Sequence, residues 1–587
     1  MAKSLYIAEK PSVAQEFANA LKKNWRRSDG YMEAEDAVVT WCVGHLVTMS
    51  YPEAYDPKYK RWSLETLPFL PKEFKYQVIE GVSKQFGIVK GLLNRHDVDT
   101  IYICTDSGRE GEYIYRLVDQ MAGVGDKKRK RVWIDSQTED EILRGIRDAK
   151  DWGEYDNLSA SAYLRAKEDY LMGINFSRLL TLKYGSVISG YLRTDRTVLS
   201  VGRVMTCVLG MTVRREREIR SFVKTPFYRV LATFLAPKAA DEPGQALSFE
   251  GEWRCVEGSK YFGTPFLYKE NGLKERKYAQ ELIDHLSKEP PLTAVLSKME
   301  KKKETKNPPL LYNLAELQND CSKMFKISPD ETLRVVQELY EKKLVTYPRT
   351  DARVLSTAVA KEIHKNIGGL KGFEPVGAFA AEILKMGSYK TIAKTRYVND
   401  KQITDHYAIV PTGQGLPALR SLAPLSVKVY EVIARRFLSI FYPPAIYQRF
   451  GLELTRMEEH FFASFRVLME PGYLKAADVP GGKKKADQKE QTGETGDAKG
   501  GGEEAAQLPK NMDNPEFIKM LGSLKKGMVL EIREFAIKEG ETSPPKRYTS
   551  GSMILAMENA GQLIEDEELR AQIKGSGIGT SATRAEI

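Results

Sequence analysis

The sequence predicts a multidomain α+β protein whose N-terminal part is an α/β domain. The chain has 587 residues, which suggests about four domains. Its composition, with 42% hydrophobic and 29% charged residues, is that of a globular protein with ample material for a core. Short apolar strands alternate with helical patterns near the N-terminus, and later parts of the chain switch between helical and β-type periodicity.

Residues 1–150 are predicted to form a parallel sheet flanked by helices. Residues 3–8 read as a buried strand, and a helical pattern follows Pro11. A second strand over 99–104 runs into a loop, TDSGREGE, and the residues after Glu112 repeat with a helical period. Strand, loop and helix, repeated, are typical of an α/β domain.

The rest of the chain divides by periodicity into four parts, predicted as helical, β-type, helical and β-type: 151–220, 221–304, 305–443 and 444–540. In the second helical part, Ser328-Pro329-Asp330-Glu331 predicts a helix start through a capping box with proline at the first helical position. Residues 476–507 are rich in Gly, Lys, Asp and Glu and have almost no large apolar residue. Such a segment is expected to be disordered.

Charge and absent motifs narrow the possible functions. Lys and Arg number 89 against 79 Asp and Glu, and this excess of +10 fits a polyanionic partner but is dilute. The five cysteines form no C-x-x-C pair, which argues against a zinc ribbon or a disulfide framework and for a reducing compartment. No stretch reaches the roughly 18 apolar residues of a membrane span, and the N-terminus resembles no signal peptide. An ATP motor is not expected, because the G-x-x-x-x-G-K-[ST] loop is missing.

Three carboxylates are predicted to meet at one edge of the N-terminal sheet. Glu9 ends the first strand, and Asp106 and Glu110 follow the second. Ligands of α/β sheets bind at the carboxyl ends of the strands, and carboxylate oxygens suit a hard cation such as Mg²⁺. With Lys10 and Arg109 beside them, these groups could handle a phosphodiester. Viewed alone, such a trio is more often a set of solvated loop charges.

A tyrosine in the run TYPRTD is a candidate nucleophile. Pro348 pushes Tyr347 into an extended conformation, in which residues two apart face the same side, so Arg349 is placed beside it. A cation there can favour the phenolate or stabilise charge on a phosphate, and tyrosine can serve as a covalent nucleophile. The chain has 29 tyrosines, so without further support a core tyrosine is the better interpretation.

Eight motifs resemble those of type IA DNA topoisomerases and occur in that family's order. They are MAKSLYIAEKPS, TDSGREGE, SVGRV, PPLLYNLAELQ, LVTYPRTDARVLS, DHYAIVPT, PPKRYTSGSMILAMENAG and GIGTSATRAEI. The AEKPS start, the TYPRTD segment and the lack of zinc ribbons resemble the topoisomerase III branch. The glycine in TDSGREGE is similar to that of bacterial members, including those on mobile elements.

This resemblance implies a torus around a hole large enough for DNA. Residues 1–150 would be a Toprim domain, and 305–443 a winged-helix-like domain that carries the nucleophile. The β-type parts, 221–304 and 444–540, would form one β-rich arch. The helical DNA-groove domain would comprise 151–220 and 541–587. The last motif stops where that domain normally continues, so the chain resembles a C-terminally truncated member.

The resemblance also implies the chemistry and the role of each site residue. Tyr347 would attack single-stranded DNA and form a transient 5′-phosphotyrosine without ATP. Strand passage and religation would then relax negative supercoils or decatenate DNA. Glu9 would assist the leaving oxygen, Lys10 and Arg349 would hold the scissile phosphate, and His406 would lie near that phosphate.

The acidic motif departs from the family pattern Asp-x-Asp-x-Glu. Gly108 stands where the second Asp is usual, which removes a carboxylate. One weakly held Mg²⁺ is therefore predicted, bound through Asp106, Glu110 and either Glu9 or Glu112.

The predicted DNA contacts lie mostly on the first helical part. They are Arg109, Arg165, Lys167, Arg178, Gly202 and Arg203. The usual S-x-G-R-V-Q-T-P stretch reads SVGRVMTCV here, so Met205 replaces an amide side chain and Cys207 replaces proline. This difference predicts a changed DNA affinity or sequence preference. His45, in WCVGHLV, is either a site residue or a core histidine, and the core interpretation is preferred.

The expected partners are single-stranded and negatively supercoiled DNA, with a helicase as a further candidate and no membrane. The expected state is a monomer in the bacterial cytoplasm, associated with the nucleoid. Two other functions stay open. A Toprim nuclease or primase has similar acidic residues but does not need Tyr347-Pro348-Arg349. A catalytically decayed DNA-binding protein is compatible with Gly108 and Met205.

Overall fold

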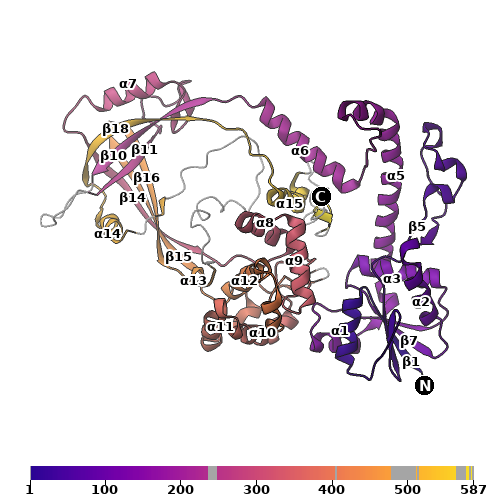
Figure 1. Cartoon of the computed structure of the whole chain (residues 1–587). Coiled ribbons are helices and arrows are strands. Elements are labelled where there is room, and N and C mark those ends of the chain that lie inside the picture. The colour runs from indigo at the N-terminus through magenta and orange to yellow at the C-terminus, as the bar shows by residue number, and fades with distance from the viewer. Residues whose placement is uncertain are drawn as a thin grey trace. The chain divides into compact units, whose positions relative to one another are not determined.

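The computed structural model describes residues 2–235, 247–403, 406–477, 510–511, 514–563, 577–580 and 583–584. They belong to two compact units, each built from separate stretches of the chain (Figure 1). Unit 1 comprises Met1–Met211, Leu310–Leu438 and Thr549–Ile587, and unit 2 comprises Thr212–Pro309 and Ser439–Tyr548. The predicted disorder over 476–507 falls outside the described residues, except that Ala476 and Ala477 end helix α13 (Leu474–Ala477).

The N-terminal part of unit 1 is a seven-stranded sheet in the order β2-β3-β4-β1-β7-β8-β9. Its central strands run parallel: β4 (Ala37–Trp41), β1 (Lys3–Ala8), β7 (Val98–Cys104) and β8 (Lys128–Arg131). Antiparallel strands complete the edges: β2 (Arg26–Ser28), β3 (Tyr31–Glu33) and β9 (Lys150–Asp151). The strands predicted over 3–8 and 99–104 are confirmed.

Helices cover both faces of this sheet. They are α1 (Pro11–Leu21), α2 (Ser83–Leu93), α3 (Arg109–Ala122) and α4 (Glu139–Arg147). Successive residues of a strand point to opposite faces. Accordingly, Leu5 and Ile7 of β1 are buried with residues of α2 and α3, whereas Tyr6 and Ala8 are buried with residues of α1 and α4. A strand buried on both faces is typical of a parallel α/β sheet.

Two long helices follow the N-terminal sheet. Helix α5 (Asp156–Leu192) has 37 residues, and at the rise of an α-helix it is about 55 Å long. It packs against α3 near its beginning. Helix α6 (Arg203–Ser221) starts in unit 1 and continues into unit 2. A small antiparallel sheet of β5 (Val47–Met49) and β6 (Tyr76–Val78) completes this region. Across the described part of the chain, no helix has the length and apolar character needed to cross a membrane.

The second helical part of unit 1 carries the TYPRTD segment. Its helices are α8 (Leu314–Phe325), α9 (Pro329–Glu341), α10 (Thr357–Gly369), α11 (Glu374–Met386) and α12 (Pro424–Ser439). The predicted start of α9 is confirmed, because the Ser328 hydroxyl accepts a hydrogen bond from the Glu331 N–H at 3.1 Å and Pro329 occupies the first turn. Helix α15 (Ser550–Glu558) packs on α8 so closely that a Cβ on Gly551 would lie 3.0 Å from the Cα of Asn319.

Unit 2 is built on one large sheet whose strands come from both sides of the 310–438 stretch. Its order is β11-β16-β15-β14-β18-β10-β13-β12, and β17 (Lys510–Asn511) pairs with β16. The long strands are β10 (Pro226–Leu235), β11 (Ser248–Arg254), β14 (Thr293–Lys306), β15 (Ala445–Arg456), β16 (Glu459–Glu470) and β18 (Val529–Glu541). The short ones are β12 (Leu267–Lys269) and β13 (Gly272–Leu273).

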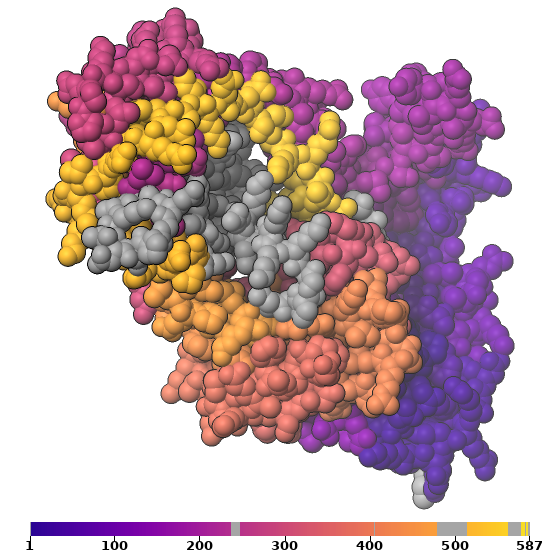
Figure 2. Space-filling view, turned by 60° about the vertical axis from the view of Figure 1, so that its left-hand side comes forward, coloured from indigo at the N-terminus to yellow at the C-terminus, as the bar shows by residue number. Residues whose placement is uncertain are grey.

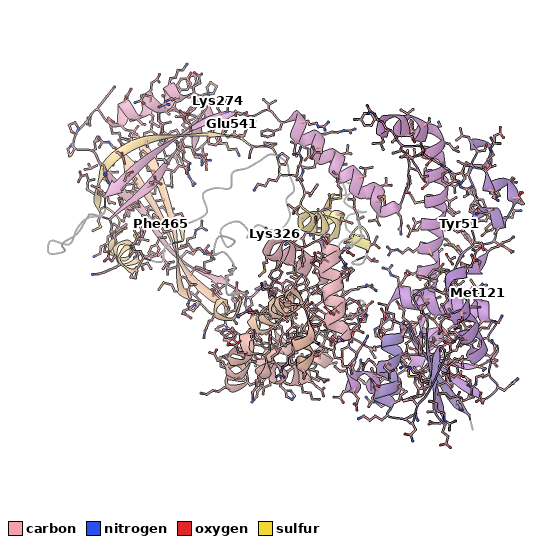
Figure 3. All side chains as sticks on the ribbon, in the orientation of Figure 1. Tyr51, Met121, Lys274, Lys326, Phe465 and Glu541 are labelled. Atoms are coloured by element: carbon pink, nitrogen blue, oxygen red, sulfur yellow. The ribbon has the colours of Figure 1, made fainter. Side chains whose placement is uncertain are left out.

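The core of unit 2 lies between this sheet and two helices that the β-type periodicity did not predict. These are α7 (Arg276–Leu286) and α14 (Pro515–Ser523), and residues of both are buried against the strands. Phe465 of β16 belongs to this core, and Glu541 ends β18 (Figure 3). Because β14 pairs with β15 over eleven residue pairs, the two β-type parts of the sequence form one sheet.

Candidate active site

Two carboxylates lie side by side at the carboxyl edge of the N-terminal sheet. Strands β1 and β7 are parallel neighbours, with Ala8 opposite Cys104, so the residues that follow emerge at the same edge. There the backbone N–H of Asp106 donates a hydrogen bond to the Glu9 carboxylate at 3.2 Å. Burial and the negative charge of Asp106 raise the pKa of Glu9 to about 7. Near neutral pH, Glu9 can therefore act as an acid that donates a proton.

The loop that carries Asp106 is clamped from two sides. The guanidinium of Arg131 donates to the carbonyl oxygens of Thr105 at 2.7 Å and of Asp106 at 2.6 Å. On the other side, α3 approaches so closely that a Cβ on Gly111 would lie 2.1 Å from the Asp106 oxygen. Only glycine fits at this position, and the rigid loop fixes where the Asp106 carboxylate points.

Tyr347 reaches the same carboxylate from the second helical part. Its hydroxyl donates to Asp106 Oδ2 at 3.2 Å, and its backbone N–H donates to the Asp135 carbonyl at 2.9 Å. In the space-filling view the orange surface of the second helical part adjoins the indigo and violet N-terminal region of the same unit (Figure 2). Burial and the charge of Asp106 raise the pKa of Tyr347 well above its usual value, although Arg349 acts in the opposite direction. Arg349 thus favours the phenolate, as expected, but burial and Asp106 outweigh it, and Tyr347 is a protonated phenol that needs a proton acceptor.

Two cations stand next to these groups. An Nη of Arg349 lies 4.0 Å from the Asp106 Oδ2 that Tyr347 also contacts, as the two-residue spacing of an extended chain predicts. The Arg349 Nε is buried and has no hydrogen-bond partner among the described residues. Lys10, which precedes α1, has its Nζ 4.0 Å from Glu341 at the end of α9. A buried donor without a partner beside a nucleophile is well placed for a phosphate oxygen.

His406 packs against the ring of Tyr347. The two ring centroids are 4.3 Å apart, and His406 is 3% exposed. Its Nδ1 lies 2.7 Å from the Asp135 carboxylate, and its Nε2 lies 2.5 Å from the Ser107 carbonyl. The structure therefore brings together all five residues predicted as catalytic, from two parts of unit 1 that are far apart in the sequence.

The chain matches two family models. The model described as DNA topoisomerase matches residues 153–587, and the model described as Toprim domain matches residues 4–136. DNA topoisomerase 3 of Bacillus licheniformis is 35% identical over 591 residues, which cover 100% of this chain and 72% of that protein. DNA topoisomerase 3 of Bacillus subtilis is 34% identical over 593 residues, with the same coverage.

The chain belongs to the type IA DNA topoisomerase family, in its topoisomerase III branch. Members of this family break and rejoin single DNA strands without ATP, so the chain is an isomerase of this type. Full-length topoisomerase I from Thermotoga maritima shares the fold, with a TM-score of 0.61 and 19% identity over 99% of this chain and 77% of that one.

Toprim domains of topoisomerases generally bind Mg²⁺, and here the predicted ligands are divided among three places. Glu9 and Asp106 are adjacent, whereas Glu110 lies 2.5 Å from the ring nitrogen of His45. Glu112 lies two residues further along α3 and points into the domain, where its buried carboxylate pairs with Arg116 and Arg131. Over the residues that the structure describes, no three His, Cys, Asp or Glu side chains gather closely enough to hold a metal.

The residues that remain still fit one Mg²⁺. This ion is commonly bound by one or two carboxylates and completes its shell with water and phosphate oxygens. Glu9 and Asp106 are two such carboxylates, and a cation between them would relieve their mutual repulsion. Glu110 is exposed on the first turn of α3, so its side chain has room to turn toward them.

His45 lies at the candidate site, in contact with Glu110. Its side chain is 36% exposed, so the interpretation as a core histidine is wrong. It follows β4, which lies parallel to β1, and therefore belongs to the same carboxyl edge of the sheet as Glu9. Its contact with Glu110 lowers the pKa of that carboxyl group, and the charges of Arg165 and Arg349 act in the same direction. A prediction of the strand over 37–41 would have revealed it.

The predicted DNA contacts of this topoisomerase family member separate into two groups. One group gathers around Arg165 of α5. Burial lowers the pKa of Arg165, and so do the nearby positive charges of Arg109, at the first turn of α3, and Arg203 of α6. Arg203 also pairs with Asp169 at 2.9 Å, and Gly202 immediately precedes it at the start of α6. These residues continue from the active site toward α6.

Lys167 and Arg178 lie on a different face of α5. Lys167 is two residues, about 200° of helix turn, from Arg165, and its ammonium lies over the rings of Phe74 and Tyr163. Arg178 is 6% exposed, and it donates to the Tyr59 carbonyl at 3.0 Å. The structure thus places neither beside Arg165, because both cations are used to fix the segment before β6 against α5.

Proposed function

We propose that the chain relaxes and decatenates DNA through transient cleavage of one strand, with Tyr347 as the nucleophile. The observation that carries this proposal is the meeting of Tyr347, Asp106 and Glu9. A phenol, a proton acceptor and a protonatable acid lie together at the carboxyl edge of the sheet.

The three groups account for each proton in the reaction. The Tyr347 oxygen attacks the phosphorus of a DNA phosphodiester, and its proton passes to the Asp106 carboxylate, to which the hydroxyl already donates. As the Tyr347–phosphorus bond forms, the bond from phosphorus to the 3′ oxygen breaks. Glu9 in its carboxylic acid form gives its proton to that oxygen. Religation reverses these transfers, so the covalent bond energy is retained and no ATP is required.

Arg349 and Lys10 are proposed to bind the scissile phosphate, and His406 to lie near it. The phosphate gains negative charge on its non-bridging oxygens in the transition state, and donors aimed at them lower the barrier. Arg349 offers its Nε, which has no hydrogen-bond partner among the described residues. The Lys10 ammonium lies 4.0 Å from Glu341, so it can turn to another anion. His406 lies over the nucleophile and therefore near the phosphate that Tyr347 attacks.

A single Mg²⁺ is proposed to be held by Asp106 and Glu110, joined by Glu9 once it has given up its proton. Glu112 is left out because its carboxylate is buried in ion pairs. When bound, the ion supplies positive charge that holds the phosphate and the DNA ends for rejoining. The carboxylates are few, so the affinity is expected to be weak. Equilibrium titration that reveals two tight metal ions would contradict this proposal.

The strand is proposed to follow Arg109, Arg165 and the start of α6 at Gly202 and Arg203. Single-stranded and negatively supercoiled DNA are the proposed substrates. A monomer in the cytoplasm, associated with the nucleoid, and a helicase partner remain proposals, as do toroidal closure and the four-domain division.

One experiment separates this function from the alternatives. Labelled single-stranded DNA and Mg²⁺ are mixed with the protein, and the mixture is then denatured. The proposal predicts a covalent protein–DNA adduct that is absent in Tyr347→Phe. Free cleaved ends without an adduct would indicate a nuclease, and binding without cleavage would indicate a decayed DNA-binding protein.

A further inference from the structure

Asp135 touches both groups that the second helical part brings to the site. It lies in the connection between β8 and α4, outside every motif that resembles the family's motifs. Its carbonyl accepts the backbone N–H of Tyr347 at 2.9 Å, and its carboxylate lies 2.7 Å from Nδ1 of His406. One residue of the Toprim domain therefore contacts the nucleophile and the histidine through separate atoms.

The His406 ring is held on every side that the described residues reach. Nδ1 faces the Asp135 carboxylate and Nε2 faces the Ser107 carbonyl. The Trp133 ring stacks near one face, with centroids 6.2 Å apart and planes 19° apart, and the Tyr347 ring lies near it at 4.3 Å. The contact with Asp135 is the one in this set that involves a carboxylate, and hydrogen bonds to a carboxylate are stronger than those to a neutral acceptor.

Asp135 is itself fixed in place. Its backbone N–H donates to the carboxylate of Glu141 at 3.0 Å, and Arg144 holds that carboxylate through a hydrogen bond of 2.8 Å. The Asp135 carboxylate is 22% exposed, so it is mostly shielded from water by the groups around it. A fixed main chain and a shielded carboxylate make Asp135 a rigid support for both partners.

We propose that Asp135 is a positioning residue for strand cleavage. Its carboxylate holds the His406 ring against the Tyr347 ring, and its carbonyl fixes the main chain of Tyr347. This inference rests on the proposed function of Tyr347. Misplacing a reacting group by about 1 Å can cost about 100-fold in rate, so a residue that aligns two such groups affects the chemical step more than binding.

The test measures adduct formation and DNA binding separately. Asp135→Ala removes the carboxylate and keeps the carbonyl. In single turnover with excess protein and a labelled oligonucleotide, we expect adduct formation to slow by about 100-fold, with the Kd for that oligonucleotide changed less than about threefold. Asp135→Asn keeps an acceptor oxygen and is expected to regain part of the rate. Asp140→Asn, on the exposed first turn of α4, is the matched control and should behave as the unaltered protein.

A double-mutant cycle asks whether Asp135 acts through His406. If it does, Asp135→Ala slows adduct formation by about 100-fold when His406 is present, but by less than about threefold when His406 is replaced by alanine. Equal slowing in both backgrounds, or no slowing in either Asp135 variant, would overturn the proposal. Loss of adduct in Tyr347→Phe is scored separately. If that variant still forms the adduct, the proposed function fails instead. Thermal unfolding of each variant shows whether a slow rate reflects misfolding. If Asp135→Ala proves to be misfolded, the rate of adduct formation by Asp135→Asn, which keeps the shape of the side chain, decides instead.

Discussion

At the scale of single residues, the site is built from groups whose charge states depend on one another. Asp106 is the common partner: it contacts Tyr347, lies beside Arg349 and raises the pKa of Glu9. The sequence indicated which residue types would meet, because strand ends and the TYPRTD run are readable. It did not indicate that burial would keep Tyr347 protonated, because burial arises from packing between segments far apart in the chain.

The raised pKa of Glu9 predicts opposite effects on stability and activity. With a folded pKa of about 7 against an ordinary 4.5, the folded state binds more protons between these values, so its stability falls as pH rises through that range. Glu9→Gln removes this penalty and is expected to raise the free energy of unfolding at pH 8 by on the order of 3 kcal/mol, measured by denaturant unfolding.

The same substitution is expected to slow adduct formation, because the leaving oxygen loses its proton donor. In the unaltered protein, the rate of adduct formation should fall as pH rises above about 7, and in Glu9→Gln this dependence should be lost. A variant with unchanged stability and an unchanged pH profile would show that Glu9 is not the titrating group.

Gly111 and Gly108, three residues apart, allow a substitution and its control to be compared in one segment. A Cβ at Gly111 would lie 2.1 Å from the Asp106 oxygen, whereas a Cβ at Gly108 would meet no heavy atom within 4 Å. Gly111→Ala is therefore expected to cost about 1–3 kcal/mol of unfolding free energy and most of the cleavage rate. Gly108→Ala is expected to leave both nearly unchanged. Equal effects at the two positions would mean that the loop is not clamped as described.

Gly108 also allows the missing carboxylate to be restored. Its backbone is extended, with φ 170° and ψ 177°, a conformation that any residue adopts. Gly108→Asp is expected to fold normally and to lower the Kd for Mg²⁺ by about tenfold, because affinity grows with the number of charged ligands. Calorimetric titration measures this, with Gly108→Asn as the neutral control, and identical affinities for both variants would place the ion elsewhere.

At the scale of elements, the helical phase of α3 and α5 decides which predicted residues face the site. Glu110 and Glu112 stand in one motif, but on a helix two residues are about 200° apart, so Glu110 faces the edge of the sheet and Glu112 faces Arg131. The TDSGREGE stretch is predicted as a loop from its sequence, and a loop prediction does not say which of its residues share a helix face. Arg178 could not be foreseen as buried, because the carbonyl it binds belongs to a segment without periodicity.

Helix α5 offers a test of the proposed DNA path. Each phosphate contact made by single-stranded DNA contributes about 0.7 to the slope of log affinity against log salt concentration. Arg165→Gln is expected to lower that slope by about 0.7 in an anisotropy titration. Lys167→Gln, on the other face, should change it far less. If the two substitutions have the same effect, the strand does not follow the face that carries Arg165.

At the scale of the whole molecule, each unit is assembled from stretches that the chain order separates. The resemblance to the family joined the β-type parts on both sides of the 310–438 stretch into one arch, and the pairing of β14 with β15 shows one sheet. The helices α7 and α14 were missed, because short amphipathic helices inside β-type parts leave only a weak signal. The site itself needs residues from the N-terminal sheet and from TYPRTD, and only the resemblance to a family joined these before the structure did.

The central claim is that Tyr347 becomes joined to the 5′ phosphate of a broken strand. The most direct measurement is mass spectrometry of peptides from the adduct that denaturant traps on a single-stranded oligonucleotide. We predict one modified peptide, in which Tyr347 carries the mass of a nucleotide attached through its 5′ phosphate. The released DNA fragment should end in a free 3′ hydroxyl. Modification of another residue, attachment through a 3′ phosphate, or cleaved DNA with no modified peptide would contradict it.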